Sequence, residues 1–230
     1  AYRDPLWAEE MCLYLLSQQY EDGHAAHACY PEDGPGKFHG TGNKHADDHL
    51  WMPMVVYAIL SETGDFSLLN KDVPWLSSKD NWTTYGSATV WEHLMRGVQF
   101  TENNLGYKGF PLTFDGDWND IILRFSRAGK GESIFCGQQY VVVLRQLIEI
   151  GNLAKMPKDD IEFLKNALNK MIKALEEHAW DGDYWRRGYT DEGDIVGTKN
   201  AEFGKIFINP QSWGVWADVG TEEQKNKSMD

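Results

Sequence analysis

The sequence is poor in cysteine, in basic residues and in long apolar runs, and each shortage excludes a class of protein. Its 230 residues include three cysteines (Cys12, Cys29 and Cys136) without CxxC spacing, which disfavours a disulfide framework or a thiolate zinc site. The 22 Lys and Arg are outnumbered by 35 Asp and Glu, a net charge of −13, and they form no basic patch for nucleic acid. Apolar runs such as residues 140–144 fall far short of the ~20 residues of a membrane-spanning helix, and no signal peptide is recognisable. We therefore expect a soluble, cytoplasmic protein that binds neither nucleic acid nor a membrane.

Aromatic residues, in contrast, are abundant. Ten Trp, ten Tyr and ten Phe make up 13% of the chain. Trp and Tyr combine flat apolar faces with a polar edge, which suits them to stacking on sugar rings, although large helical cores use them as well. The composition suggests carbohydrate as a ligand class but does not establish it.

Apolar residues recur with helical spacing over much of the chain. The clearest helix is predicted after Pro157, with a buried stripe formed by Ile161, Leu164, Leu168, Met171, Ile172 and Leu175. Thr221, which is followed by acidic residues, predicts another helix start. Further helices are predicted over residues 6–19, 47–62, 66–76, 88–103 and 133–150, the last being apolar on most faces and therefore an inner helix. Short hairpins are predicted near residues 183–189 and 205–209.

Long, Gly-rich polar connections separate these helices at residues 22–46, 106–131 and 180–211. Connections of that length are usually functional. Helices joined alternately by short and long loops indicate an all-α toroid of paired helices, with the long loops gathered at one end as a pocket. No motif at a fixed period supports a repeat solenoid. We expect about eight helices, fewer than the twelve of a closed (α/α)6 barrel, and both ends of the chain look cut from something larger.

The densest cluster of reactive side chains is the segment Phe114-Asp115-Gly116-Asp117-Trp118-Asn119-Asp120. Carboxylates crowded beside an aromatic wall raise one another's pKa, and in this way an Asp becomes a general acid near neutral pH. A cluster of Asx-turns and helix caps is the plain alternative. A calcium loop is a third hypothesis, although the twelve-residue EF-hand pattern is missing. The residues by themselves leave these three hypotheses open.

Histidine pairs are the next candidates for a site. His45 and His49 are four residues apart and would share one face of a helix, as metal ligands do. However, the two Asp residues between them are typical of a helix start, and the Glu of an HExxH motif is missing. His24 and His27 also form a pair, but no Cys or convergent acid lies near them in the sequence. We therefore predict no metal site.

Other catalytic motifs are absent or incomplete. Residues 129–133, Gly-Lys-Gly-Glu-Ser, place glycines before a helix start, where backbone N–H groups can hold an anion, but they lack the spacing of a phosphate-binding P-loop. No GxSxG nucleophile elbow occurs, and no cysteine has a histidine partner by motif. Covalent acyl transfer is therefore disfavoured.

Several segments, taken in order, resemble the inverting glycoside phosphorylases of the cellobiose phosphorylase family. The resemblance covers nearly the whole chain, and its most specific segment is Gly-Asp-Trp-Asn-Asp at residues 116–120. The other matching segments are YRD at 2–4, SQQYEDG at 17–23, HADDHLW at 45–51, TVWEHL at 89–94, GKGES at 129–133 and NPQSW at 209–213.

The resemblance implies an (α/α)6 barrel that lies between an N-terminal β-sandwich and a C-terminal cap. Residues 1–230 would then be part of this single barrel domain, without the sandwich, the rest of the barrel and the cap. The implied reaction is the reversible, inverting phosphorolysis of a β-glucoside, with cellobiose or a cellodextrin preferred, to α-glucose 1-phosphate. The partners are then a β-linked gluco-oligosaccharide and inorganic phosphate as co-substrate. No cofactor is expected, and a homodimer is left open.

Carried over residue by residue, the resemblance implies that Asp120 is the general acid and that Trp118 lines the subsite of the transferred glucosyl unit. It implies that Asp4 binds hydroxyls of that sugar and that Arg3 contacts the sugar or the phosphate. The other phosphate-binding residues of the family would lie beyond Asp230. The alternatives are an inverting hydrolase on a helical toroid and a non-catalytic carbohydrate-binding module.

Overall fold

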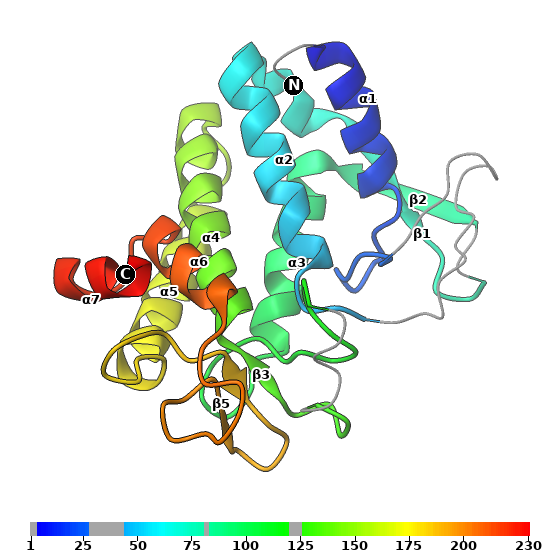
Figure 1. Cartoon of the computed structure of the whole chain (residues 1–230). Helices are drawn as coiled ribbons and strands as arrows, with labels where there is room; N and C mark the ends of the chain where they lie inside the picture. Colours follow the sequence, from blue (N-terminus) through cyan, green and yellow to red (C-terminus); the bar gives the residue numbers. More distant parts are fainter. Residues whose placement is uncertain (1–3, 28–43, 81–82, 120–125) are drawn as a thin grey trace. The chain divides into compact units, whose positions relative to one another are not determined.

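The computed structural model describes residues 4–27, 44–80, 83–119 and 126–230. The chain divides into two compact units, one formed by residues 1–103 and 146–161 and the other by residues 104–145 and 162–230. The described residues form seven α-helices, one 3-10 helix and five short strands (Figure 1). No helix in these described ranges is both long and apolar enough to span a membrane.

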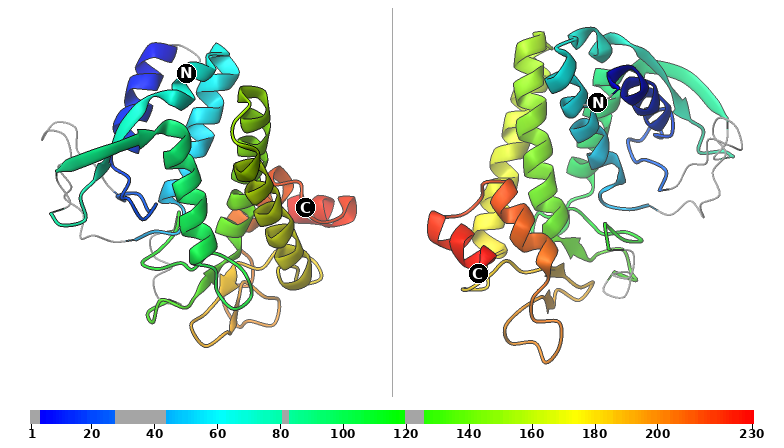
Figure 2. Two further views of the ribbon diagram at one scale, coloured as in Figure 1. Left: turned by 180° about the vertical axis from the view of Figure 1, so that it is seen from behind. Right: turned by 45° about the horizontal axis from the view of Figure 1, so that its top comes forward.

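Three helices of the first unit pack against one another: α1 (Pro5–Leu16), α2 (Asp48–Thr63) and α3 (Val90–Asn103) (Figures 1 and 2). The α1 helix begins where the Asp4 carboxylate accepts the Trp7 N–H at 3.0 Å. The α3 helix begins where the Glu92 carboxylate accepts the Thr89 N–H at 2.7 Å and the Thr89 hydroxyl accepts the Glu92 N–H at 3.2 Å. These contacts satisfy N–H groups that a helix start leaves unpaired, and the helices predicted in these regions are confirmed.

The helix predicted over residues 66–76 is wrong. Residues Phe66–Asn70 form a 3-10 helix, η2, and Asp72–Leu76 form strand β1, which pairs antiparallel with β2 (Thr84–Thr89). Pro74 explains the break, because proline removes a helical N–H group and clashes with the preceding turn. The strand register shifts at this proline, as is usual for proline within a sheet. The resulting hairpin is visible in Figure 2.

The two longest helices, α4 (Ile134–Ala154) and α5 (Lys158–His178), contribute residues to both units. Every residue from 131 to 144 is buried, which confirms the predicted inner helix. Along α5 the side chains of Leu164, Met171 and Leu175 are buried, whereas lysines on the opposite face are exposed. The stripe predicted for this helix is therefore also confirmed.

The second unit contains a small antiparallel sheet with the order β3-β4-β5. Its strands are Glu132–Ser133, Gly188–Tyr189 and Ile195–Val196, and Leu112 forms an additional bridge to Glu132. Pairing of β4 with β5 confirms a hairpin in the region predicted near residues 183–189. Segments from two of the long predicted connections therefore meet at this sheet.

The chain continues with α6 (Ile208–Trp216) and α7 (Glu222–Met229), which pack against each other in the second unit (Figure 1). The hairpin predicted near residues 205–209 is wrong, because α6 begins at Ile208. Pro210 lies in the first turn of this helix, where the missing N–H group costs no hydrogen bond. The helix start predicted at Thr221 is confirmed, since Thr221 and Gln224 form a capping box.

Candidate functional site

A buried ion pair anchors the loop that carries the densest acidic cluster. Asp117 and Arg187 are both 0% exposed, and Arg187 Nη2 donates to the two carboxylate oxygens of Asp117 at 2.6 Å each. Ser133 Oγ donates to Asp117 Oδ2 at 2.7 Å and accepts from Arg187 Nη1 at 3.1 Å. Three segments that are far apart in the sequence are joined at this point. A buried charge pair is tolerated when its geometry is good and further hydrogen bonds complete it.

Neighbouring segments fix both the main chain and the side chain of Arg187. The Arg187 N–H group donates to the Val196 carbonyl at 2.8 Å, and the Arg187 carbonyl accepts from the Ile134 N–H group at 3.2 Å. The guanidinium carbon lies 5.6 Å from the centre of the Phe135 ring. Gly197 permits this close approach, because a Cβ atom there would lie 2.8 Å from Arg187 N and because its φ of +74° suits glycine.

The loop around Asp117 is tightly turned and presents one aromatic ring. The N–H group of Asn119 donates to Asp117 Oδ1 at 3.0 Å, which is an Asx-turn. Phe114 has a φ of 49°, a left-handed conformation that is uncommon for a residue other than glycine. Trp118 is 63% exposed. The Asx-turn hypothesis thus holds for Asp117, whose carboxylate is committed to anchoring the loop, and the Trp118 side chain projects from this anchored base.

The four predicted site residues do not all lie in the same unit, and two of them lie outside the described residues. Trp118 belongs to the second unit, whereas Asp4 belongs to the first, is exposed, and caps α1 through Oδ1. Asp120 and Arg3 lie outside the described residues. The contacts that Asp120 and Arg3 make with a sugar or with phosphate stay predictions.

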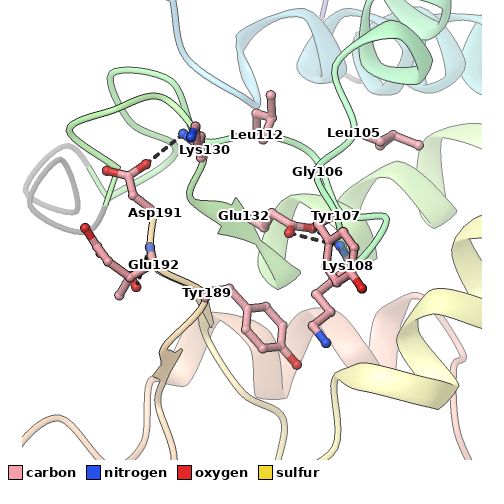
Figure 3. A pocket seen from close by; sticks show the side chains of 12 residues that line it. Leu105, Gly106, Tyr107, Lys108, Leu112, Lys130, Glu132, Tyr189, Asp191 and Glu192 are labelled. Carbon is pink, nitrogen blue, oxygen red and sulfur yellow. Dashed lines mark hydrogen bonds between the residues drawn. The ribbon is translucent and has the colours of Figure 1, made fainter.

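A pocket of about 380 Å³ lies beside strand β3 (Figure 3). Because successive strand residues point to opposite faces, Ser133 faces Asp117 whereas Glu132 faces this pocket. The Glu132 carboxylate accepts the N–H groups of Lys108 and Phe110 at 3.0 Å each. Burial raises the pKa of Glu132 above its usual value of 4.5, although these two hydrogen bonds act in the opposite direction.

Glu132 thereby shapes the loop that forms one wall of the pocket. A Cβ atom at position 106 would lie 2.3 Å from Glu132 Cδ, so a larger residue there would displace the Glu132 side chain. The next residue, Tyr107, is 95% exposed, and Figure 3 shows it beside Lys108 next to the Glu132 carboxylate. Tyr189, on β4, lines the pocket from another side. The pocket therefore has aromatic walls, and its buried acid is already hydrogen-bonded to backbone.

The glycine-rich loop at residues 129–131 already holds an anion, the carboxylate of Asp191. This side chain accepts the N–H groups of Ala128 and Lys130 at 2.7 Å each and of Gly131 at 3.0 Å. Figure 3 shows Asp191 directed toward Lys130. Phosphate would have to displace Asp191 to bind these groups, so the loop is a structural element in this chain.

The sequence motifs did not predict the roles of three residues. These are Arg187, its partner Ser133, and Asp191. The only signal for Arg187 is a charge between the aromatic residues Trp185 and Tyr189, at positions that alternate as in a strand. Its partner Asp117 is 70 residues away. A contact of that sequence separation is set by the tertiary fold.

His45 and His49 do not share a helix face, because α2 begins at Asp48 and His45 lies before it. His49 is buried, and its Nε2 lies 2.7 Å from the Thr101 hydroxyl on α3. Burial lowers the pKa of His49 from 6.5 to about 3, so this ring is neutral. His49 is a packed core histidine that joins α2 to α3.

These observations define the class: an all-α domain of helices joined by long connections, which carry an anchored acidic loop with an exposed tryptophan. Over residues 1–230 the sequence matches the family described as "Glycosyl hydrolase 94 superfamily, catalytic domain". The chain belongs to this family. The match confirms the resemblance to inverting glycoside phosphorylases and the fold class, since the catalytic domain of this family is an (α/α)6 barrel.

Two curated relatives are similar over nearly the whole chain. Solabiose phosphorylase from Paenibacillus borealis is 29% identical over 228 residues, covering 98% of this chain and 27% of the relative. The 3-O-beta-D-glucopyranosyl-beta-D-glucuronide phosphorylase of the same organism is 28% identical over 230 residues, covering 98% and 28%. The chain thus spans about a quarter of the length of these relatives.

A solved structure supports the fold alone. The family 10 polysaccharide lyase from Cellvibrio cellulosa superimposes with a TM-score of 0.55 at 10% sequence identity. The superposition covers 96% of this chain and 64% of that chain.

Proposed function

We propose that the protein containing this chain is an inverting glycoside phosphorylase in which Asp120 is the general acid and inorganic phosphate is the nucleophile. The observation that carries this proposal is the anchored loop. Asp117 is held at its base by Arg187, Trp118 is exposed, and Asp120 follows three residues after Asp117. The family match over residues 1–230 supports the same assignment.

In the proposed reaction the Asp120 carboxyl donates its proton to the glycosidic oxygen. Phosphate attacks C1 of the glucosyl unit from the opposite face, the bond from C1 to the glycosidic oxygen breaks, and the acceptor sugar leaves with the proton. The product is α-glucose 1-phosphate. An inverting hydrolase needs a second carboxylate to activate water, whereas phosphate is already an anion, so one acid is sufficient. Surrounding acidic groups stabilise the oxocarbenium-like charge.

The remaining assignments follow from the same proposal. Trp118 packs against the transferred glucosyl unit, Asp4 binds its hydroxyls, and Arg3 contacts sugar or phosphate. Asp4 caps α1 through Oδ1 and is exposed, which leaves Oδ2 for a sugar hydroxyl. The proposed substrate is cellobiose or a cellodextrin, phosphate is the co-substrate, no cofactor takes part, and the protein acts in the cytoplasm.

The deciding experiment incubates the full-length protein with cellobiose in the presence and absence of phosphate. We expect α-glucose 1-phosphate, identified by its anomeric NMR signal, and strict dependence on phosphate. The Asp120→Asn variant should lose at least about 100-fold in kcat, as expected when a general acid is removed, while it still binds the sugar. Glu177→Gln, which replaces an exposed acid on α5, is the control and should retain activity.

Two other results would each support a different function. Hydrolysis that persists in phosphate-free buffer would indicate an inverting hydrolase. Sugar binding with turnover that Asp120→Asn does not change would indicate a module in which this loop takes no part in catalysis.

A further inference from the structure

The connection between α1 and α2 brings two histidines and an aspartate together in the first unit. Among the residues that the structure describes, His27, His45 and Asp48 are the one group of three metal-ligating side chains whose donor atoms all lie within 4.8 Å of one another. His27 lies within this connection, His45 lies near its end, and Asp48 is the first residue of α2. The cluster therefore links two segments separated by residues 28–44.

One pair in the cluster, His27 and Asp48, has the spacing of two ligands around one ion. His27 Nδ1 lies 3.3 Å from Asp48 Oδ1 and 3.2 Å from Asp48 Oδ2. In a tetrahedral zinc site with bonds of about 2.0–2.1 Å, neighbouring ligand atoms are about 3.3 Å apart. The rings of His27 and His45 are stacked with their centres 3.7 Å apart and an angle of 19° between their planes. The stacking holds the two rings side by side, and the donor atoms of all three residues lie within 4.8 Å of one another.

The environment of the cluster also suits a cation. His45 is 5% exposed, the Asp48 side chain is 17% exposed and the His27 side chain is 37% exposed. The cluster is thus buried on one side and open to solvent on the other, which gives an ion a path of entry. The neighbouring Asp47 is buried and accepts the Trp51 indole N–H at 2.9 Å, so that carboxylate supports the helix start.

We propose that His27, His45 and Asp48 form a three-ligand site for a divalent transition-metal ion, of which Zn²⁺ is the type case, with a further position open to solvent. Two imidazoles and one carboxylate favour zinc and similar ions over magnesium or calcium, which prefer oxygen ligands. Such an ion cross-links the segment that carries His27 to the start of α2. The earlier prediction of no metal site is revised by this proposal, which is independent of the proposed phosphorolysis.

The test measures Zn²⁺ binding to the metal-stripped, full-length protein by isothermal titration calorimetry at neutral pH, with Zn²⁺ alone as the probe. We expect one ion to bind at this site. His27→Ala and Asp48→Asn should each weaken binding by at least about tenfold, since loss of even an outer-sphere partner costs that much. His178→Ala is the matched control, because His178 lies on α5 in the second unit and should not change the affinity.

The proposal fails if the wild type binds no Zn²⁺, or if both variants bind it as tightly as the wild type. The cluster would then consist of the His27–Asp48 ion pair and the His45 ring stacked on His27, without a bound metal. His27 is the most exposed of the three residues, so its alanine variant should remain folded, and circular dichroism checks this. Since no turnover is measured, failure of the phosphorylase proposal would not affect the result.

Discussion

A single buried contact, between Asp117 and Arg187, fixes the loop on which the proposed chemistry depends. Both side chains lose their hydrogen bonds to water when they are buried. The contacts with each other and with Ser133 must replace that lost stabilisation. Arginine is suited to this position because its planar fork meets both carboxylate oxygens at once. Lysine offers a point charge on a flexible stem and would not reproduce this geometry.

The first prediction concerns removal of the arginine. Arg187→Met leaves the Asp117 carboxylate buried without its cation, and we expect the free energy of unfolding to fall by about 3–5 kcal/mol. The double variant with Asp117→Leu should recover most of this loss, since a buried ion pair and an apolar pair are often similarly stable. Urea unfolding of the full-length protein measures both effects.

The control for this experiment is an exposed ion pair on α5. Lys173 Nζ lies 3.8 Å from Glu177 Oε1, and both side chains are largely exposed. Lys173→Ala should change stability by less than about 1 kcal/mol. A wild-type unfolding curve for Arg187→Met would contradict the anchoring role of the pair.

At the scale of elements, one histidine on α3 connects three parts of the first unit. His93 Nδ1 lies 2.8 Å from Gln19 Oε1, and His93 Nε2 lies 3.0 Å from the Val73 carbonyl on β1. Its ring stacks on Trp75 with the centres 3.6 Å apart. Burial lowers the pKa of His93 from 6.5 to about 4, opposed by the Val73 hydrogen bond and the Glu92 charge. The ring is therefore neutral in the folded chain near pH 7.

This depressed pKa makes the stability of the first unit depend on pH. Below pH 6.5 an unfolded chain protonates His93 whereas the folded chain does not, so the unfolded state takes up more protons. Stability is fully present above pH 6.5 and is lost as the pH falls toward 4, with a limiting slope of about 1.4 kcal/mol per pH unit. His93→Gln should be less stable at neutral pH but lose less on acidification.

Urea unfolding between pH 7 and pH 4 measures this difference in slope, because the two proteins share all their other titratable groups. Asn166→Ala, on the exposed face of α5, removes no titratable group and should retain the wild-type slope. Equal slopes for wild type and His93→Gln would show that His93 is not the titrating group.

At the scale of the whole molecule, the identity of the proposed acceptor sugar does not follow from overall sequence similarity. Two relatives of nearly equal identity, 29% and 28%, bear the names of phosphorylases for different disaccharides. Similarity across this chain consequently does not select among acceptors.

The corresponding prediction concerns the reverse reaction of the full-length protein with α-glucose 1-phosphate. We expect phosphate release to be fastest with D-glucose or cellobiose as acceptor and at least several-fold slower with glucuronate or N-acetylglucosamine. A colorimetric phosphate assay across these acceptors measures the ranking. Faster release with glucuronate would contradict the preference for cellobiose or cellodextrin while leaving phosphorolysis itself intact.

Local signals predicted most of the helices because their causes lie within a few residues. The apolar stripe of α5, the continuous burial of α4 and the cap at Thr221 each depend on near neighbours along the chain. The errors arose where a local preference was overruled. Pro74 and pairing with β2 converted the second half of a predicted helix into a strand, and α6 replaced a predicted hairpin.

The sequence by itself determined the helical fold class and the family, because periodicity, caps and ordered motifs such as residues 116–120 are properties of neighbouring residues. The tertiary structure decided that Asp117 is the acid that anchors the loop. Asp117 meets Arg187 across 70 residues, the glycine-rich loop meets Asp191, and His27 meets Asp48. The physical reason is that burial and charge pairing between distant segments exist only after the chain has folded.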